Sequence, residues 1–144
     1  MAVTVKSIKM YRGVFEDKAG VLAGVLEPLA GAGANLQIVM GYRMGTEGQA
    51  AIELFPVTGK KAVAAAQAAG LAAMTMPTLL IQGDDRPGLG HAISRALADA
   101  GINIHFLVVQ VLGRRFTAVY GFENEADARK SAGLIKKAAG AKKK

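Results

Sequence analysis

The segment DDRPGLGHAISRALADAGINI, Asp84 to Ile104, decides how the rest of the chain is interpreted. It begins with an acidic turn and a Pro-Gly pair, after which Leu89, Ile93 and Leu97 recur at every fourth position. That spacing places three apolar side chains on one face of a helix. Gly101 is expected to end the helix in a left-handed cap, and extended chain is expected to follow.

A second version of the segment, EDKAGVLAGVLEPLAGAGANL, lies at Glu16 to Leu36. Sliding the chain by 68 residues aligns the two copies without a gap and gives seven identities over positions 17–36. The identical pairs are Asp17/Asp85, Gly20/Gly88, Leu29/Leu97, Ala30/Ala98, Ala32/Ala100, Gly33/Gly101 and Asn35/Asn103. Such agreement in register indicates an internal duplication. We predict two modules, residues 1–70 and 71–144, the second ending in a basic tail at 140–144.

Each copy has the pattern of a β-α-β-β-α unit. Strands are expected at Ser7 to Phe15, 35–40 and 49–55 in the first copy, and at 77–83, 103–112 and 116–122 in the second. Pro87 is expected in the first turn of the second copy's first helix. Later helices are expected at 60–69, with Thr58 as N-cap and Gly70 as stop, and at 125–139, with a capping box of Asn124 and Asp127.

This order predicts an α+β protein made of two tandem ferredoxin-like βαββαβ modules, each an antiparallel sheet with its helices on one face. Each module needs one more strand. Residues 72–76 can supply it for the first copy, but only AKKK follows the last helix of the second. The segment Ala2 to Val5 is therefore predicted to close the second module, either in its own chain or in a partner chain.

Composition describes a folding globular chain of 144 residues, with 51% hydrophobic and 20% charged residues. It has no cysteine, so disulfides and thiolate metal sites are excluded. The net charge is +7, but five lysines lie in the last nine residues, and the rest of the chain carries only +2. The N-terminal MAVTVKSIKMYRG lacks the apolar core of a signal peptide, and we expect a cytoplasmic protein.

The run Asp-Arg-Pro-Gly-Leu, an amphipathic helix and Ala-Gly-Ile-Asn-Ile resemble the ACT domain, a family of small regulatory modules associated with enzymes of amino-acid metabolism. The resemblance covers both copies; in the first, Asp17-Lys-Ala-Gly20 stands in place of Asp-Arg-Pro-Gly. It implies modules paired side by side that bind an amino acid where they meet. It also implies a non-catalytic sensor, or a regulator that acts in trans on an enzyme, and a homodimer.

The resemblance implies binding positions at the acidic turn, the helix start and the beginning of the second strand. They are Asp85, Arg86, Pro87, Gly88, Leu89, Gly90, Asn103 and Ile104 in the second copy, and Asp17, Gly20, Val21, Asn35 and Leu36 in the first. A carboxylate there can accept from a ligand ammonium, and free backbone N–H groups can receive a carboxylate. Replacing Gly88 by a β-branched residue is expected to block the ligand and leave the fold intact. Turn formation alone is the competing interpretation.

No pattern of catalysis accompanies these motifs. His91 and His105 have no cysteine or suitably spaced carboxylate with which to hold a metal, and Gly88-Leu-Gly90 lacks the third glycine of a dinucleotide fingerprint. We therefore expect no enzyme activity of its own, no cofactor, no metal and no membrane segment.

Two other functions stay open. The RNA recognition motif has the same strand and helix order, and Gly113-Arg-Arg-Phe-Thr-Ala-Val-Tyr-Gly-Phe resembles its third-strand signature. The first strands of both copies and the third strand of the first copy offer few aromatic side chains on which bases could stack, so nucleic acid is the less favoured partner. A purely structural or protein-interaction module is the remaining alternative. Strands that are apolar on both faces favour association of modules or chains.

Overall fold

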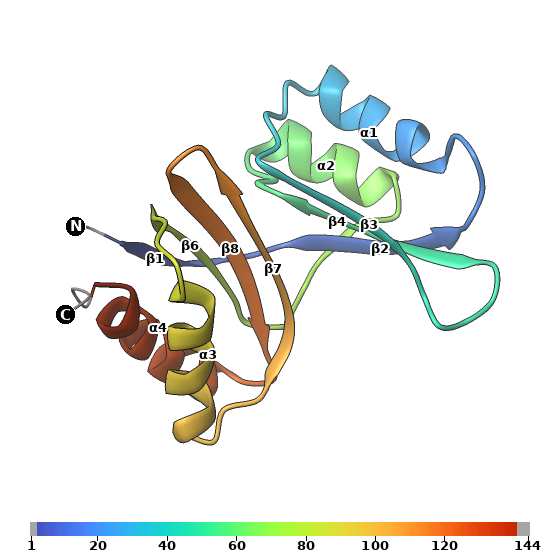
Figure 1. The fold of residues 1–144 in the computed structure, drawn as a ribbon. Helices are drawn as coiled ribbons and strands as arrows, with labels where there is room; N and C mark the ends of the chain where they lie inside the picture. Colours follow the sequence, from blue (N-terminus) through green and yellow to red (C-terminus); the bar gives the residue numbers. More distant parts are fainter. Residues whose placement is uncertain (1–2, 141–144) are drawn as a thin grey trace. The chain divides into compact units, whose positions relative to one another are not determined.

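A computed structural model describes residues 3–140 (Figure 1). In this part of the chain, strands and helices form two antiparallel four-stranded sheets, each with its own pair of helices. The chain divides into two compact units. Unit 1 combines the chain up to Ile8 with the chain from Met76 onward, and unit 2 runs from Lys9 to Thr75. Unit 2 thus holds most of the first copy and unit 1 most of the second.

Unit 2 is a complete ferredoxin-like module. Its elements are β2 (Tyr11–Glu16), α1 (Val21–Gly31), β3 (Ile38–Arg43), β4 (Gln49–Phe55), α2 (Lys60–Ala68) and β5 (Ala72–Ala73). The sheet order is β3-β4-β2-β5, with every neighbouring pair antiparallel. Val25 and Leu29 of α1 pack with Ile52 and Leu54 of β4 in one core. The predicted closing strand after α2 is confirmed as the short β5.

Unit 1 has the same architecture with its strands in a different chain order. Its elements are β1 (Thr4–Ile8), β6 (Thr78–Asp84), α3 (Leu89–Asp99), β7 (Ile104–Leu112), β8 (Arg115–Phe122) and α4 (Glu125–Gly140). The sheet order is β1-β6-β8-β7. Leu89, Ile93 and Leu97, the three residues of the helical spacing, are all buried in its core. The predicted α+β fold of two tandem ferredoxin-like modules is confirmed.

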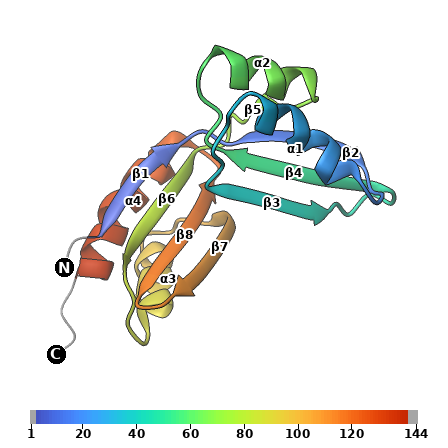
Figure 2. The ribbon, with the colours of Figure 1, turned by 90° about the horizontal axis from the view of Figure 1, so that it is seen from above.

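The N-terminal strand closes the second module within the same chain. β1 lies antiparallel beside β6, with Thr4 opposite Gln82 and Ile8 opposite Thr78, as Figures 1 and 2 show. Val3 and Val5 pack against the core of unit 1. The strand runs a few residues later than predicted, and Ala2, the first residue of the predicted segment, lies outside the described residues, as does most of the predicted basic tail.

Three local predictions were wrong. The apolar run Ser7 to Phe15 is not one strand, because its first part pairs with β6 in one sheet and its later part with β4 in the other. Thr58 does not cap α2: Gly59 occupies the N-cap, and no side chain bonds to the helix start. Pro87 precedes α3 instead of lying in its first turn, because the chain makes a tight turn before the helix begins.

The predicted helix ends are confirmed. Gly33 and Gly101 adopt φ of 79° and 74° and follow α1 and α3. In each case the glycine N–H and the next N–H bond back to helix carbonyls, as in a Schellman motif; for α1 these are Gly33 to Ala30 at 3.0 Å and Ala34 to Leu29 at 3.0 Å. At the start of α4, the Asp127 N–H donates to Asn124 Oδ1 at 2.8 Å, as the capping box predicted.

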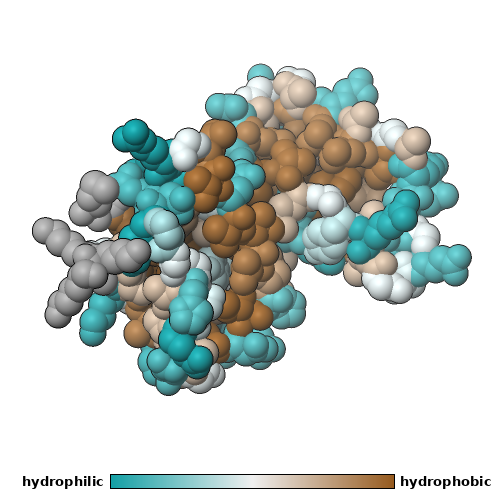
Figure 3. All heavy atoms as spheres, in the orientation of Figure 1, coloured by the Kyte–Doolittle hydropathy of each residue, from teal (hydrophilic) through white to brown (hydrophobic). Residues whose placement is uncertain are grey.

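Strand β7 forms one edge of the unit 1 sheet and keeps apolar side chains at the surface. Its exposed residues include Leu107, Val109 and Val111 on the helix side and Val108 and Leu112 on the other. Figure 3 shows apolar side chains gathered over this strand. No helix of residues 3–140 is long and apolar enough to cross a membrane.

A chain lacking residues 1–5 tests the role of β1. The deletion removes Thr4 and Val5 of β1, leaves β6 unpaired at Gln82 and Ile81, and takes Val3 and Val5 away from the core. We expect the free energy of unfolding to fall by about 1–3 kcal/mol, since full burial of a valine contributes roughly 1.5 kcal/mol or more and these two are partly buried. Urea denaturation measures the change, and an unchanged midpoint would show that unit 1 does not need the strand.

Candidate functional site

The acidic turn before each first helix has the same backbone geometry in both units. The N–H of Leu89 bonds to the Arg86 carbonyl at 3.2 Å, and Gly88 between them has φ 83° and ψ −1°. These values match the second central residue of a type II turn, with proline at the first central position. In unit 2, Val21 bonds to Lys18 at 3.4 Å and Gly20 has φ 91°. Glycine is therefore required by the turn itself.

In unit 1, three predicted site residues come together beside the sheet. Asp85, Leu89 and Gly90 line a cavity under α3, with Ile93, Val109, Phe116, Ala118 and Tyr120 as the remaining wall. Its volume is only about 40 Å³. That is far below the roughly 300–1,000 Å³ of small-molecule pockets.

The other predicted residues of the second copy lie outside that cavity. Arg86 donates from Nη2 to the Ala138 carbonyl at 2.8 Å and so ties the turn to the end of α4. Pro87 and Gly88 form the turn. Asn103 is exposed and Ile104 packs against the core, both beyond the C-terminal end of α3. An 11-residue helix is roughly 16 Å long, so the structure does not bring the two predicted walls together.

Unit 2 has a much larger cavity at the equivalent place. Its volume is about 330 Å³. The lining comes from the turn, the start of α1 and the two strands β3 and β4: Glu16, Asp17, Lys18, Val21, Leu22, Gly41, Tyr42, Arg43, Ala50, Ala51 and Ile52. Asp17 Oδ2 and Arg43 Nε form an ion pair at 2.8 Å. The cavity thus combines opposite charges with an apolar floor.

Of the residues predicted in the first copy, Asp17 and Val21 line this cavity. Gly20 forms the turn, and Leu36 packs against the core of unit 2. Asn35 lines a different cavity of about 330 Å³, together with Gln37 and Thr58 among others, beyond the other end of α1. As in unit 1, helix α1 separates the turn from the asparagine.

Gly41, Tyr42, Arg43 and Ala50 were missed from the sequence. The available signal was Arg43, a charged residue at the end of the otherwise apolar strand IVMGYR. Arg43 pairs with Ala50, which lies two residues before the core residue Ile52 on β4. Side chains two residues apart on a strand point to the same face, so Arg43 points to the helix-covered face, where its side chain reaches Asp17. The β4 residue that lies opposite Arg43 is known only from the register of the sheet and not from the sequence.

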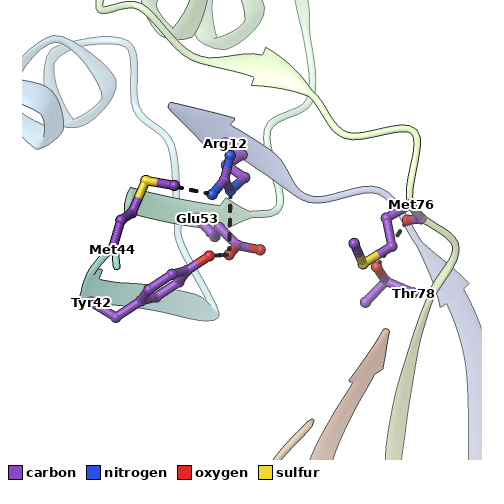
Figure 4. Close-up of polar contacts among 6 residues, drawn as sticks. All are labelled: Arg12, Tyr42, Met44, Glu53, Met76 and Thr78. Atoms are coloured by element: carbon purple, nitrogen blue, oxygen red, sulfur yellow. Dashed lines mark hydrogen bonds and ion pairs between the residues drawn. The ribbon is translucent and has the colours of Figure 1, made fainter. Parts of the chain in front are cut away.

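A second polar cluster lies on the opposite side of the unit 2 sheet (Figure 4). Tyr42 Oη donates to Glu53 Oε2 at 2.6 Å, and Arg12 Nε lies 3.8 Å from the same oxygen. Glu53 is 2% exposed, and its Oε1 has no hydrogen-bond partner among the described residues. Burial, followed by the hydrogen bond to Glu53, raises the pKa of Tyr42 above its usual value. Tyr42 belongs both to this cluster and to the cavity lining, but its side chain points to the face opposite that of Arg43, because side chains alternate along β3.

The aromatic residues of the RNA-like signature do not form a stacking surface. Phe116, Tyr120 and Phe122 are each at most 2% exposed and lie in the core of unit 1, covered by its helices. The rings of Tyr120 and Phe122 stack on each other with centroids 6.3 Å apart. Burial raises the pKa of Tyr120. Single-stranded RNA needs exposed rings, so these three cannot serve as its platform.

His91 and His105 are both exposed. Within residues 3–140 no group of three or more histidines and carboxylates is arranged to hold a metal ion.

Solved structures share this architecture over nearly the whole chain. The protein BT0572 from Bacteroides thetaiotaomicron matches with a TM-score of 0.74 and 18% identity over 90% of this chain and 88% of that one. The ligand-free regulatory subunit of aspartate kinase from Thermus thermophilus matches with a TM-score of 0.64 and 18% identity, over 94% and 95% of the two chains. The chain has a tandem ACT-like fold. The resemblance seen in the sequence is confirmed at the level of the fold.

A larger enzyme contains the same arrangement as one part. The chain matches E. coli aspartokinase III, solved in complex with aspartate and ADP, with a TM-score of 0.56 and 12% identity, over 96% of this chain and 32% of that one. No protein-family model and no curated protein sequence matches the chain.

Paired substitutions test whether Gly88 is required by the turn. A Cβ added at Gly88 or at Gly90 meets no atom within 4 Å, but only Gly88 has a positive φ. Gly88→Ala is expected to lower the free energy of unfolding by about 1–2 kcal/mol, because an L-residue is strained there. Gly90→Ala, inside α3, is expected to raise it by roughly 0.5–1 kcal/mol. Urea denaturation of both variants measures the contrast.

The expectation that a β-branched residue at Gly88 leaves the fold intact was therefore wrong: such a residue strains the fold as well as any site. Equal stability of the Gly88→Ala and Gly90→Ala variants would contradict the turn assignment.

Proposed function

We propose that the protein is a non-catalytic regulatory protein that binds an amino acid in the unit 2 cavity. It would act as a sensor, or in trans on an enzyme of amino-acid metabolism. The observation that carries the proposal is the cavity itself, where the carboxylate of Asp17 and the guanidinium of Arg43 meet above an apolar floor. A free amino acid has an ammonium group and a carboxylate on its α-carbon, which complement the charges of Asp17 and Arg43, and it has a variable side chain on the same carbon.

The chemistry of the lining suits such a ligand. The Arg43 guanidinium can donate two parallel hydrogen bonds to an α-carboxylate, which is the geometry that arginine provides best. Asp17, with Glu16 beside it, can accept from an α-ammonium. Val21, Ala50 and Ile52 can contact the ligand's side chain. A volume of about 330 Å³ lies at the lower end of the range for small-molecule pockets, roughly 300–1,000 Å³.

The comparisons support a regulatory role. The Thermus thermophilus match is a regulatory subunit that is a separate chain, and the two chains cover each other almost end to end. In aspartokinase III the matching arrangement is about a third of an enzyme that was solved with aspartate and ADP.

A non-catalytic role also fits the composition of the lining. The cavity walls contain no serine, cysteine or histidine, and so no Ser-His or Cys-His pair of the kind that activates a hydroxyl or thiol nucleophile. In unit 1, the predicted residues Asp85, Leu89 and Gly90 line the smaller cavity at the equivalent place.

Self-association is part of the proposal. β7 leaves one edge unpaired in the unit 1 sheet, and its apolar side chains on both sides are exposed. Exposed apolar edges of this kind favour pairing with another chain. We expect a homodimer by light scattering at micromolar concentration. Val109→Lys together with Val111→Lys should give a folded 15 kDa monomer, and a monomeric wild-type protein would overturn this part.

A thermal-shift screen against the twenty amino acids tests the proposed ligand class. An amino acid present at ten times its Kd stabilises the folded state by about 1.4 kcal/mol. That should raise Tm by roughly 2–8 °C. No shift with any of the twenty would favour a purely structural or protein-interaction role.

Arg43→Ala tests the site. We expect it to weaken binding of the amino acid found in the screen by roughly 10- to 150-fold, since a hydrogen bond to a charged group contributes about 1.5–3 kcal/mol. Arg115→Ala is the matched control, because Arg115 pairs with Asp84 at 3.1 Å in unit 1 and lies outside the cavity. Titration calorimetry gives both affinities. Equal losses in the two variants would place the ligand elsewhere.

A further inference from the structure

The sheet register shows which residues of the two units are structurally equivalent. The repeat aligns Phe15 with Gly83, and these residues pair with Ala50 and Phe116 respectively. Ala50 in unit 2 therefore occupies the place of Phe116 in unit 1. By the same reasoning, Gly13 and Ile81 pair with Ile52 and Ala118, which makes those two equivalent.

The equivalent positions on the edge strands β3 and β7 follow from these pairs. Gly41 lies opposite Ile52, and Val109 lies opposite Ala118. Arg43 lies opposite Ala50, as Val111 lies opposite Phe116. Unit 2 thus has glycine, alanine and arginine where unit 1 has Val109, Phe116 and Val111. All three unit 2 residues line its cavity.

Glycine in place of Val109 and alanine in place of Phe116 both remove side-chain volume, in the direction of the difference between about 330 Å³ in unit 2 and about 40 Å³ in unit 1. Phe116 is 2% exposed, and its ring lies over Gly83, where it meets an added Cβ at 3.0 Å. In unit 2 the ring belongs to Phe15 and lies instead over Gly13 and Gly70, away from the cavity. The floor at Ala50 is left free. A Cβ added at Gly41 meets no atom within 4 Å.

From these pairs we infer that Gly41 and Ala50 keep one amino-acid site open in unit 2, and that Val109 and Phe116 fill its counterpart in unit 1. The chain then binds one amino acid, and that amino acid has an apolar side chain. The inference rests on the proposed function. It adds the stoichiometry, the residues that decide it and the class of side chain.

The class of the ligand's side chain follows from the residues that occupy the equivalent space in unit 1. In unit 1, Val109 and Phe116 line the small cavity beside the turn together with Ala118. In unit 2 the corresponding floor is Ile52 and Ala50, with Val21 and Leu22 on the helix side. The lining has four charged side chains, which form two pairs: Asp17 with Arg43 at 2.8 Å and Glu16 with Lys18 at 3.4 Å. In the proposed site the ligand's own charges engage Asp17 and Arg43, Glu16 and Lys18 engage each other, and the ligand's side chain meets the apolar floor of Ile52 and Ala50.

Calorimetric titrations with L-leucine, L-phenylalanine, L-aspartate and L-lysine test the inference. The wild-type protein should bind L-leucine or L-phenylalanine with one site per chain and more tightly than the two charged amino acids. Gly41→Val and Ala50→Phe each copy the unit 1 residue into unit 2 and should weaken that binding roughly 5- to 150-fold or abolish it. Gly45→Val, which adds the same side chain to open space outside the cavity, should bind like the wild type.

The outcomes separate the inference from the proposed function. If none of the twenty amino acids binds, both are wrong. If the protein binds only L-aspartate or L-lysine, the proposed function stands and the apolar class is wrong. Two sites per chain would overturn the closure of unit 1, and wild-type affinity in Gly41→Val would overturn the position of the site. Should Ala50→Phe fail to fold by circular dichroism, Gly41→Val decides, because its Cβ meets no neighbour and valine suits a strand.

Discussion

The antiparallel pairing of β1 with β6 is the constraint on which this fold depends. In a ferredoxin-like module the first strand lies inside the sheet, so it needs a neighbour on each side. β2 has β4 and the short β5, but β6 would have only β8 if the chain began later. The N-terminal residues fill that place, although the whole of unit 2, Lys9 to Thr75, lies between them and β6 in the sequence. Each unit is then a complete four-stranded sheet with helices on one face. The turn before its first helix directly follows the inner strand, β2 or β6, and so has a fixed position at the end of that strand.

Much of this architecture could be predicted from the sequence. The four-residue spacing of Leu89, Ile93 and Leu97 identified a buried helix face, and the glycines at 33 and 101 marked the helix ends. The missing strand of the second copy could be located because a module without it leaves an edge open. The prediction failed where one apolar run serves two sheets, at residues 7–15. Local hydrophobicity reports burial and says little about which sheet a strand joins.

The site could be predicted only in part, and the reason is a change of register. The 68-residue shift that aligns the helices also aligns β3 with β7. The connection from β3 to β4 is longer than the one from β7 to β8, so the equivalent of Ala50 is Phe116 and not Ala118. Aligned by the repeat alone, positions 50 and 118 are both alanine, and the decisive difference is hidden. Asn35 and Asn103 follow the two helix ends, and a helix separates each of them from the cavity beside its turn, so their role in binding stays a prediction.

The ion pair of Asp17 with Arg43 can belong to a binding site without opposing it. Asp17 and Arg43 have side-chain exposures of 32% and 85%, and pairs that exposed contribute on the order of 0–1 kcal/mol. An incoming carboxylate and ammonium can separate the two residues at small cost, since each charge exchanges one partner for another and none is left unpaired. A buried pair would resist such exchange, because separating it strands a charge away from water. The ion pair holds both side chains beside the cavity, which reduces the ordering that a ligand must impose.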